Sequence, residues 1–171
     1  MKKLKNKNKL LLLVLGLICV TGCDSNSDNI DNKIKYDVTG LNHTTCTRKA
    51  EVNDDSTTVR INFDLYSDDE GYLMILESKE EIKSSNSELL DQYETAYKNV
   101  YKVYDDIKYY DNTVTRTNDK VISATTINYG KVDMEKVRQI EGEEDNVKME
   151  NGKIKLSDWK NFAKEYGTTC D

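Results

Sequence analysis

The 171-residue chain contains no proline and only one histidine, His43. The absence of proline accompanies an abundance of asparagine, aspartate, lysine and isoleucine, a bias typical of an AT-rich genome rather than of a particular fold. With a single histidine, every catalytic triad that uses an imidazole base has to include His43. The GxSxG, phosphate-loop, dinucleotide-binding and HExxH motifs are also missing. Carboxylate pairs are therefore the main remaining option for an enzyme, and no spacing singles one out.

Long hydrophobic runs are also scarce, and the one that stands out lies near the N-terminus. It extends from Leu10 to Val20, and five lysines precede it. At about 11 residues, the run is shorter than the roughly 20 that a membrane-spanning helix needs. A basic segment, a short apolar segment and small residues at its end are the layout of a secretory signal peptide. A buried core helix is the alternative, but the run has no polar face and its flanks differ strongly in charge.

The end of this run, Val20-Thr21-Gly22-Cys23, resembles a bacterial lipobox. The resemblance implies that cleavage falls between Gly22 and Cys23 and that Cys23 carries a covalent diacylglyceryl lipid, with no other cofactor expected. Two acyl chains give the stable anchoring that one chain cannot. Cleavage by an ordinary signal peptidase without lipid attachment is the alternative. We therefore expect a protein held by lipid at the extracytoplasmic face of the cell membrane.

Processing at this site would change the size and charge of the chain. Removal of residues 1–22 would leave 149 residues, a natural size for one domain. The leader carries five lysines and no acidic residue, so the formal net charge would change from −6 to −11. This acidity argues against nucleic acid and anionic lipid headgroups as partners, and it is compatible with cationic ligands or with solubility alone. The polar residues 23–43 are expected to form a flexible tether, and residues 44–171 a single domain.

The pattern of apolar residues predicts the elements of this domain. A period of two residues predicts strands, bounded by turn residues, at Thr45–Val52, Thr57–Tyr66, Tyr72 to about Ile82, Ile107–Arg116 and Val121–Tyr129. A period of 3.6 residues predicts a helix from Leu89 to Tyr104, preceded by the capping-box spacing of Ser85–Glu88.

Two further helices are expected near the C-terminus. One runs from Met134 to Ile140 between Asp133 and Gly142, and the other begins at Ser157 as its N-cap and stops at Gly167. Because the strands follow one another through hairpins rather than crossovers, we expect an α+β fold. It consists of an antiparallel sheet of about five strands with two to three helices packed on one face.

Two cysteines, Cys46 and Cys170, remain in the expected mature chain beside the lipid-bearing one. Outside the cytoplasm disulfides form readily, and the ends of a domain are often close in space, so we predict a Cys46–Cys170 disulfide. A reactive or metal-binding thiol pair is the alternative, as is a thiol–imidazole pair of Cys46 with His43. Neither cysteine belongs to a CxxC motif, and no metal site is expected.

Four tyrosines share one face of the first predicted helix: Tyr93, Tyr97, Tyr101 and Tyr104. Exposed on the surface, they would form a stacking platform for a glycan or a peptide. Packed on the sheet, they would cover it while their hydroxyls reach water at the rim. We favour packing, and we keep these four residues as the candidate ligand-binding site.

The order of segments along the chain resembles that of a known group of proteins. The lipobox-like sequence is followed by a polar tether and then by the segments "CTRKAEV", "LLDQYETAYKNVY", "IKYYDNTVT" and "SATTINYGKVD". This pattern resembles the small lipoproteins of low-GC Gram-positive bacteria, and it is similar in layout to the YehR-type lipoproteins. The resemblance implies an α+β domain at the cell envelope, with no established activity and no catalytic residue to carry over. We therefore expect a non-enzymatic binding or interaction module whose partner is an envelope protein or a glycan. A small envelope enzyme or accessory subunit that uses carboxylates is the alternative.

The lipobox leads to a direct test. Replacing Cys23 with alanine removes the sulfur that would carry the lipid, so Cys23→Ala should abolish metabolic labelling of the protein by a fatty-acid probe. Labelling that persists in this variant would refute the lipoprotein assignment.

Overall fold

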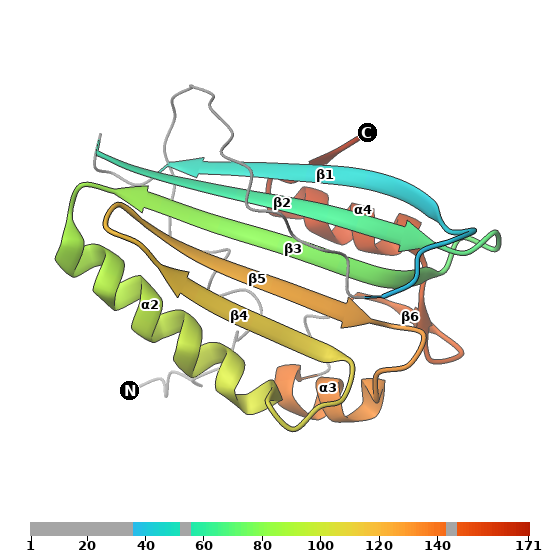
Figure 1. The fold of residues 1–171 in the computed structure, drawn as a ribbon. Coiled ribbons are helices and arrows are strands. Elements are labelled where there is room, and N and C mark those ends of the chain that lie inside the picture. Colours follow the sequence, from blue (N-terminus) through green and yellow to red (C-terminus); the bar gives the residue numbers. More distant parts are fainter. Residues whose placement is uncertain (1–35, 52–55, 143–146) are drawn as a thin grey trace, which may run out of the picture.

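The computed structural model describes residues 36–51, 56–142 and 147–171. Its main strands are β1 (Asn42–Glu51), β2 (Thr57–Ser67), β3 (Leu73–Ser84), β4 (Tyr110–Arg116), β5 (Lys120–Asn128) and β8 (Thr169–Cys170). The helices are α2 (Ser87–Tyr101), continued by the short 3-10 helix η1 (Lys102–Tyr104), α3 (Met134–Glu141) and α4 (Leu156–Glu165). A small hairpin pairs β6 (Met149–Glu150) with β7 (Lys153–Ile154) (Figure 1).

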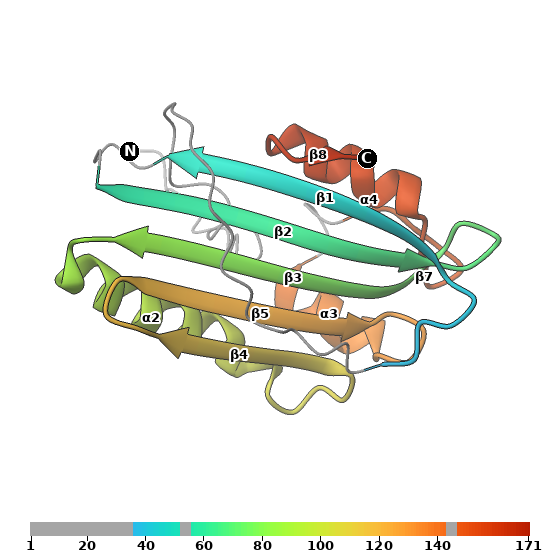
Figure 2. The same ribbon diagram turned by 45° about the horizontal axis from the view of Figure 1, so that its top comes forward.

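The main strands form one antiparallel six-stranded sheet in the order β4-β5-β3-β2-β1-β8. The three helices lie on the same face of this sheet, with α4 behind β1 and β2 and α2 along the β4 side (Figures 1 and 2). The structure thus confirms the α+β fold and the antiparallel sheet with helices on one face. Among the residues described, no helix is both long and apolar enough to cross a membrane.

Strand β2 shows how the sequence pattern builds this arrangement. Its alternate residues Val59, Ile61 and Leu65 are buried in the core under the helices. The residues between them, such as Asp64, point to the opposite face because successive side chains of a strand alternate. In register, Ile61 is paired with Arg48 on one side and with Glu80 on the other. The apolar period of β2 therefore fixes which side chains of β1 and β3 also face the helices.

The helix ends agree only in part with the caps expected from the sequence. Asp133 accepts a hydrogen bond from a backbone N–H at the start of α3, and Gly142 ends that helix, as expected. The cap of α2 is Asn86 rather than a residue of the Ser85 capping box, because the Asn86 side chain accepts the bond from the Leu89 N–H at 3.1 Å. Asparagine caps as well as serine does.

The start of α4 is also set by a contact that the local sequence does not reveal. The helix begins at Leu156, with Lys155 as its cap residue, so Ser157 is inside the first turn rather than the N-cap. The Leu156 N–H donates to the Gly71 carbonyl at 2.9 Å, which ties the helix start to the turn before β3. This tertiary hydrogen bond overrides the local capping preference of Ser157.

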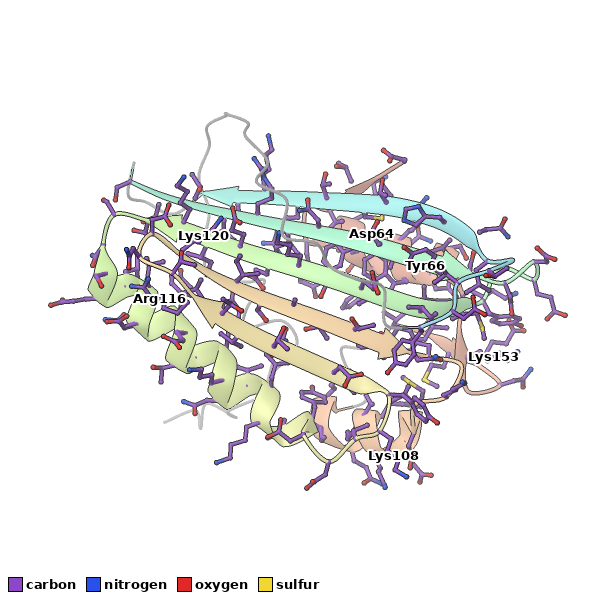
Figure 3. The ribbon with its side chains drawn as sticks, viewed as in Figure 1. Asp64, Tyr66, Lys108, Arg116, Lys120 and Lys153 are labelled. Carbon is purple, nitrogen blue, oxygen red and sulfur yellow. A yellow bond between two sulfur atoms is a disulfide. The ribbon has the colours of Figure 1, made fainter. Side chains whose placement is uncertain are left out.

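Strand β1 begins two residues before the domain boundary expected at position 44. His43 is therefore part of the sheet, where its ring stacks on Tyr66 with 4.7 Å between centroids and its Nε2 lies 2.8 Å from the Asp64 carboxylate. Figure 3 labels Asp64 and Tyr66 on the face of the sheet turned away from the helices. The polar start of β1 has no apolar alternation, so its pairing with β2 is not visible in the sequence.

The predicted disulfide is present. Cys46 in β1 and Cys170 in β8 are directly opposite each other in register, with 4.0 Å between their Cα atoms. The bridge is buried at Cys46 and fastens the short last strand to the edge of the sheet. It also rules out the thiol–imidazole alternative, because Cys46 has no free thiol and His43 lies at the opposite phase of β1.

Reduction should measure what this bridge contributes. The two cysteines are 124 positions apart, and the chain-entropy model gives at most about 4–5 kcal/mol of unfolding free energy for a loop of this size. We expect the denaturant midpoint of the wild-type protein to fall on reduction. The Cys46→Ser, Cys170→Ser double variant serves as control, since its midpoint should not respond to the reductant. Equal midpoints for oxidised and reduced wild type would contradict this account.

Candidate functional site

A cavity of about 110 Å³ lies on the helix-facing side of the sheet. Its floor is formed by the middle of the sheet, including Ser78 of β3 and Thr125 of β5. One side is contributed by the end of α2 and by η1, through Tyr101 and Tyr104. The other side is contributed by α4, through residues such as Ala163. The cavity is thus bounded by elements from most of the chain.

The wall of the cavity is strongly aromatic. Eight of its eighteen residues are aromatic, in a chain that has fourteen aromatic residues in all. Both phenylalanines of the chain, Phe63 and Phe162, and its single tryptophan, Trp159, belong to this wall. The five tyrosines are Tyr101, Tyr104, Tyr110, Tyr129 and Tyr166. The aromatic residues of this sequence are therefore concentrated around one cavity.

Two aromatic groups face the cavity from its two sides. On the α4 side, Phe63 and Trp159 meet edge to face with 5.1 Å between their centroids. On the η1 side, Tyr104 stacks on Tyr110 of β4 at 4.3 Å and an interplanar angle of 12°. Edge-to-face and stacked pairs at such distances are favourable beyond the area they bury. The rings are therefore held in place by one another as well as by the sheet.

The four tyrosines expected to form a site play different parts. Tyr97 and Tyr104 are only 1% and 2% exposed, and Tyr97 packs in the core between α2 and the sheet. Tyr101 and Tyr104 line the cavity. Tyr93, nearer the start of α2, is half-buried and is not among the lining residues. The tyrosine face is therefore a packing surface over part of its length and a cavity wall at its end. Ligand binding by these tyrosines stays a prediction.

The floor of the cavity is polar where the sheet is most central. Ser123 and Thr125 of β5 are buried there, and the side-chain amide of Asn112 in β4 donates to both hydroxyls, at 3.0 and 2.8 Å. The same amide also donates to the Ala124 carbonyl. Buried polar groups are tolerated when they are hydrogen-bonded, and the Asn112 amide provides these bonds.

The most unusual group of the site is the carboxyl of Glu80. Its side chain is 7% exposed, in the strand register between Ile61 and Ser123. Burial raises the pKa of Glu80 to about 7, although the Tyr97 hydroxyl and the positive charge of Arg48 in β1 act to lower it. The Tyr97 hydroxyl interacts with this carboxyl outside ordinary hydrogen-bond geometry. Desolvation therefore outweighs both favourable partners.

Charge is otherwise missing from the cavity wall. Although 33% of the chain is charged, Glu80 is the one acidic residue among the described residues that line the cavity, and none of these is lysine, arginine or histidine. Another carboxyl with a raised pKa, that of the half-buried Glu141 at the end of α3, accepts a hydrogen bond from the Tyr104 hydroxyl at 3.3 Å. Burial raises its pKa to about 7 as well, but Glu141 does not line the cavity.

This arrangement bears on catalysis by carboxylates. Glycoside hydrolysis of the usual kind needs two carboxyl groups that flank one substrate. Among the described residues that line the cavity there is one carboxyl group, Glu80, so these residues do not form such a pair. What the site offers chemically is an aromatic enclosure with one titratable acid.

Glu80 and Trp159 were missed as site residues by sequence reasoning, although a signal for Glu80 exists. In β3, Leu76 and Ile82 are on the helix-facing side, and the period of two places Ser78 and Glu80 on that side too. A glutamate at the apolar phase of a strand is uncommon because its burial is unfavourable unless it has partners. The predicted lipid-attachment and cleavage residues, Gly22 and Cys23, lie outside the described residues.

Comparison with known proteins shows the fold alone. No family model and no curated protein matches the chain. The NMR structure of the Escherichia coli YehR protein is similar, with a TM-score of 0.51 and 18% identity over 77% of this chain and 93% of that one. An NMR structure of a protein from Streptococcus pneumoniae has a TM-score of 0.43 and 15% identity, over 91% and 100% of the two chains. The similarity to YehR supports the α+β fold of this chain, and it assigns no ligand.

The buried Glu80 carboxyl should make stability depend on pH. The pKa of Glu80 rises from the ordinary 4.5 to about 7 on folding, so the folded state binds this proton more tightly than the unfolded chain does. The resulting loss of unfolding free energy is absent below about pH 4.5 and reaches its full size above about pH 7. The wild-type protein should therefore lose about 2–3 kcal/mol of unfolding free energy relative to Glu80→Gln between pH 5 and pH 8.

Urea unfolding of both proteins across this pH range measures the difference. The control is Glu81→Gln, which removes the same charge from the next residue of β3 on the opposite face, where Glu81 is paired with Lys120 at 3.6 Å. Glu141 is common to all three proteins and cancels. If the unfolding free energies of wild type and Glu80→Gln change with pH in parallel, Glu80 is not a buried acid with a raised pKa.

Proposed function

We propose that the protein is a non-enzymatic binding module, anchored by lipid on Cys23 at the extracytoplasmic face of the membrane, that holds a small and mainly apolar ligand in the aromatic cavity. The observation that carries this proposal is the gathering of eight aromatic residues, with Trp159 and both phenylalanines among them, around one enclosed space. If these aromatic residues served only to pack the core, we would expect their side chains to fill the space, because protein interiors are normally packed to crystal-like density.

The size of the cavity limits the ligand. Its volume of about 110 Å³ is somewhat below that of the roughly 150 Å³ engineered apolar cavities that bind benzene. A single ring or a short branched chain fits, whereas a polymer does not. A glycan or an envelope protein, the partners expected from the sequence, would reach the cavity only through one inserted group.

The expected anchor suits such a ligand. A polar tether from Cys23 to the first strand would hold the domain within roughly 20–25 Å of the membrane on average. Small apolar molecules concentrate at membranes, so a domain close to the surface meets them at raised local concentration. The alternative of a carboxylate enzyme finds less support, since Glu80 is the single acid among the described residues of the cavity wall.

Trp159 provides the test, because the only tryptophan of the chain lies in the cavity wall. Small ring compounds, both neutral and charged, are titrated into the full-length protein while Trp159 fluorescence is recorded. We expect saturable binding of at least one of them, with a Kd on the order of 1 mM or tighter for a ligand of this size.

Cavity-filling variants identify where the ligand binds. Ala163→Leu, at the α4 wall, should remove the saturable response, and Val100→Phe should do so from the α2 wall. Ala96→Leu, an exposed position of α2, is the matched control and should leave binding intact. The proposal is wrong if no compound gives a saturable response, or if Ala163→Leu and Val100→Phe both fold and bind as the wild type does.

A further inference from the structure

We infer that the ligand is an organic cation, an amine or quaternary ammonium group carrying a small apolar body, and that the Glu80 carboxylate is its counter-ion. This inference rests on the proposed function, because it assigns the class of ligand to the same cavity. It follows from the charges in the cavity wall, the number of aromatic rings around the cavity and the neighbours of Glu80.

The charges in the wall favour a cation over an anion or a neutral molecule. Glu80 contributes the single carboxyl, and no basic side chain is among the described lining residues. An anionic ligand would meet a like charge in a medium of low dielectric constant, where repulsion is strong. A neutral apolar ligand would displace water from the carboxyl and provide no charge in return, which is unfavourable for a buried acid.

The aromatic rings add a second attraction for a cation. The face of an aromatic ring carries partial negative charge, and ammonium groups bind over such faces, most strongly when water is excluded. Here rings from α4, such as Trp159, and from η1 and β4, such as Tyr104 and Tyr110, stand on different sides of one space. Aromatic enclosures of this kind are typical of sites for methylated or quaternary ammonium groups.

The neighbours of Glu80 leave the carboxyl in need of a closer positive charge. Arg48 acts on it from β1, but β2 lies between their strands, with Ile61 paired to both residues. From α2, Tyr97 and also Tyr93 and Tyr101 interact with the Glu80 charge. These groups together do not offset burial, as the raised pKa of Glu80 shows. A ligand cation inside the cavity would supply the charge that the protein does not place there.

The experiment compares small ligands that differ in charge. Benzyl alcohol is neutral, benzylamine is cationic and of the same shape, tetramethylammonium is a compact cation with a fixed positive charge, and phenylacetate is anionic. Each is titrated into the full-length protein at pH 7.5 with Trp159 fluorescence and two-dimensional NMR as readouts. We expect the two cations to bind at least tenfold more tightly than benzyl alcohol, and phenylacetate more weakly than benzyl alcohol.

Two variants separate Glu80 from a general effect of negative charge. Glu80→Gln should weaken binding of the cations by about tenfold, because only the attraction of the aromatic rings is left, while benzyl alcohol stays bound. Glu81→Gln, which removes a carboxylate from the opposite face of the same strand, should keep the preference for cations. Loss of the preference in both variants would overturn the assignment of Glu80.

A pH series on the wild-type protein and on Glu80→Gln gives an independent test. Tetramethylammonium keeps its charge at every pH, so only protein groups change. With the Glu80 pKa at about 7, the affinity should fall about tenfold from pH 8 to pH 6, as the carboxylate is protonated. Benzyl alcohol should show no such fall. Glu141 titrates in the same range, and the absence of the effect in Glu80→Gln distinguishes the two acids.

The outcomes distinguish the two proposals. Binding of benzyl alcohol that equals or exceeds binding of the cations would overturn the cation assignment and leave the cavity as a site for neutral ligands. Failure of all four compounds to bind would overturn the proposed function itself, and the cation assignment with it.

Discussion

Two helices cover opposite halves of one sheet face, and the space between them has to be filled by long side chains. Helix α2 packs on the β4, β5 and β3 side, and α4 lies over β2 and β1 (Figures 1 and 2). The middle of the sheet is therefore reached by aromatic rings from both helices rather than by a helix backbone. Rings such as Trp159 and Tyr104 fill most of this space but not all of it, and the cavity is what remains. The other features of the site follow from this geometry.

Glu80 is the feature that packing alone does not explain. A glutamate in the middle of a sheet, on the side that the helices cover, lowers the stability of the fold increasingly between about pH 4.5 and pH 7, because its burial is only partly offset by Tyr97 and Arg48. Residues that break the rules of stable folding occur most often where a protein binds or reacts. We propose that a cationic ligand offsets the unfavourable burial of Glu80. The same residue then lowers the stability of the ligand-free protein and increases its affinity for the ligand.

The parts of the fold that the sequence predicts are those with a local signal. The alternation of Val59, Ile61 and Leu65 identifies β2 and its buried face, and the cysteine positions indicate the bridge. The parts that it does not predict depend on contacts between distant segments. Strand β8 has two residues and exists through its pairing with β1, and the start of α4 depends on the Gly71 carbonyl. The role of Trp159 could not be predicted, because nothing local indicates that its ring meets Phe63 and that a space is left beside them.

An NMR titration of the Glu80 carboxyl in the full-length protein, with and without saturating tetramethylammonium, tests the counter-ion role of Glu80 most directly. We expect a pKa of about 7 for Glu80 in the free protein. This pKa should decrease clearly on binding, because a neighbouring positive charge favours the ionised form. A Glu80 pKa near the ordinary value of 4.5 in the free protein, or one that does not change when the cation is bound, would contradict the counter-ion role.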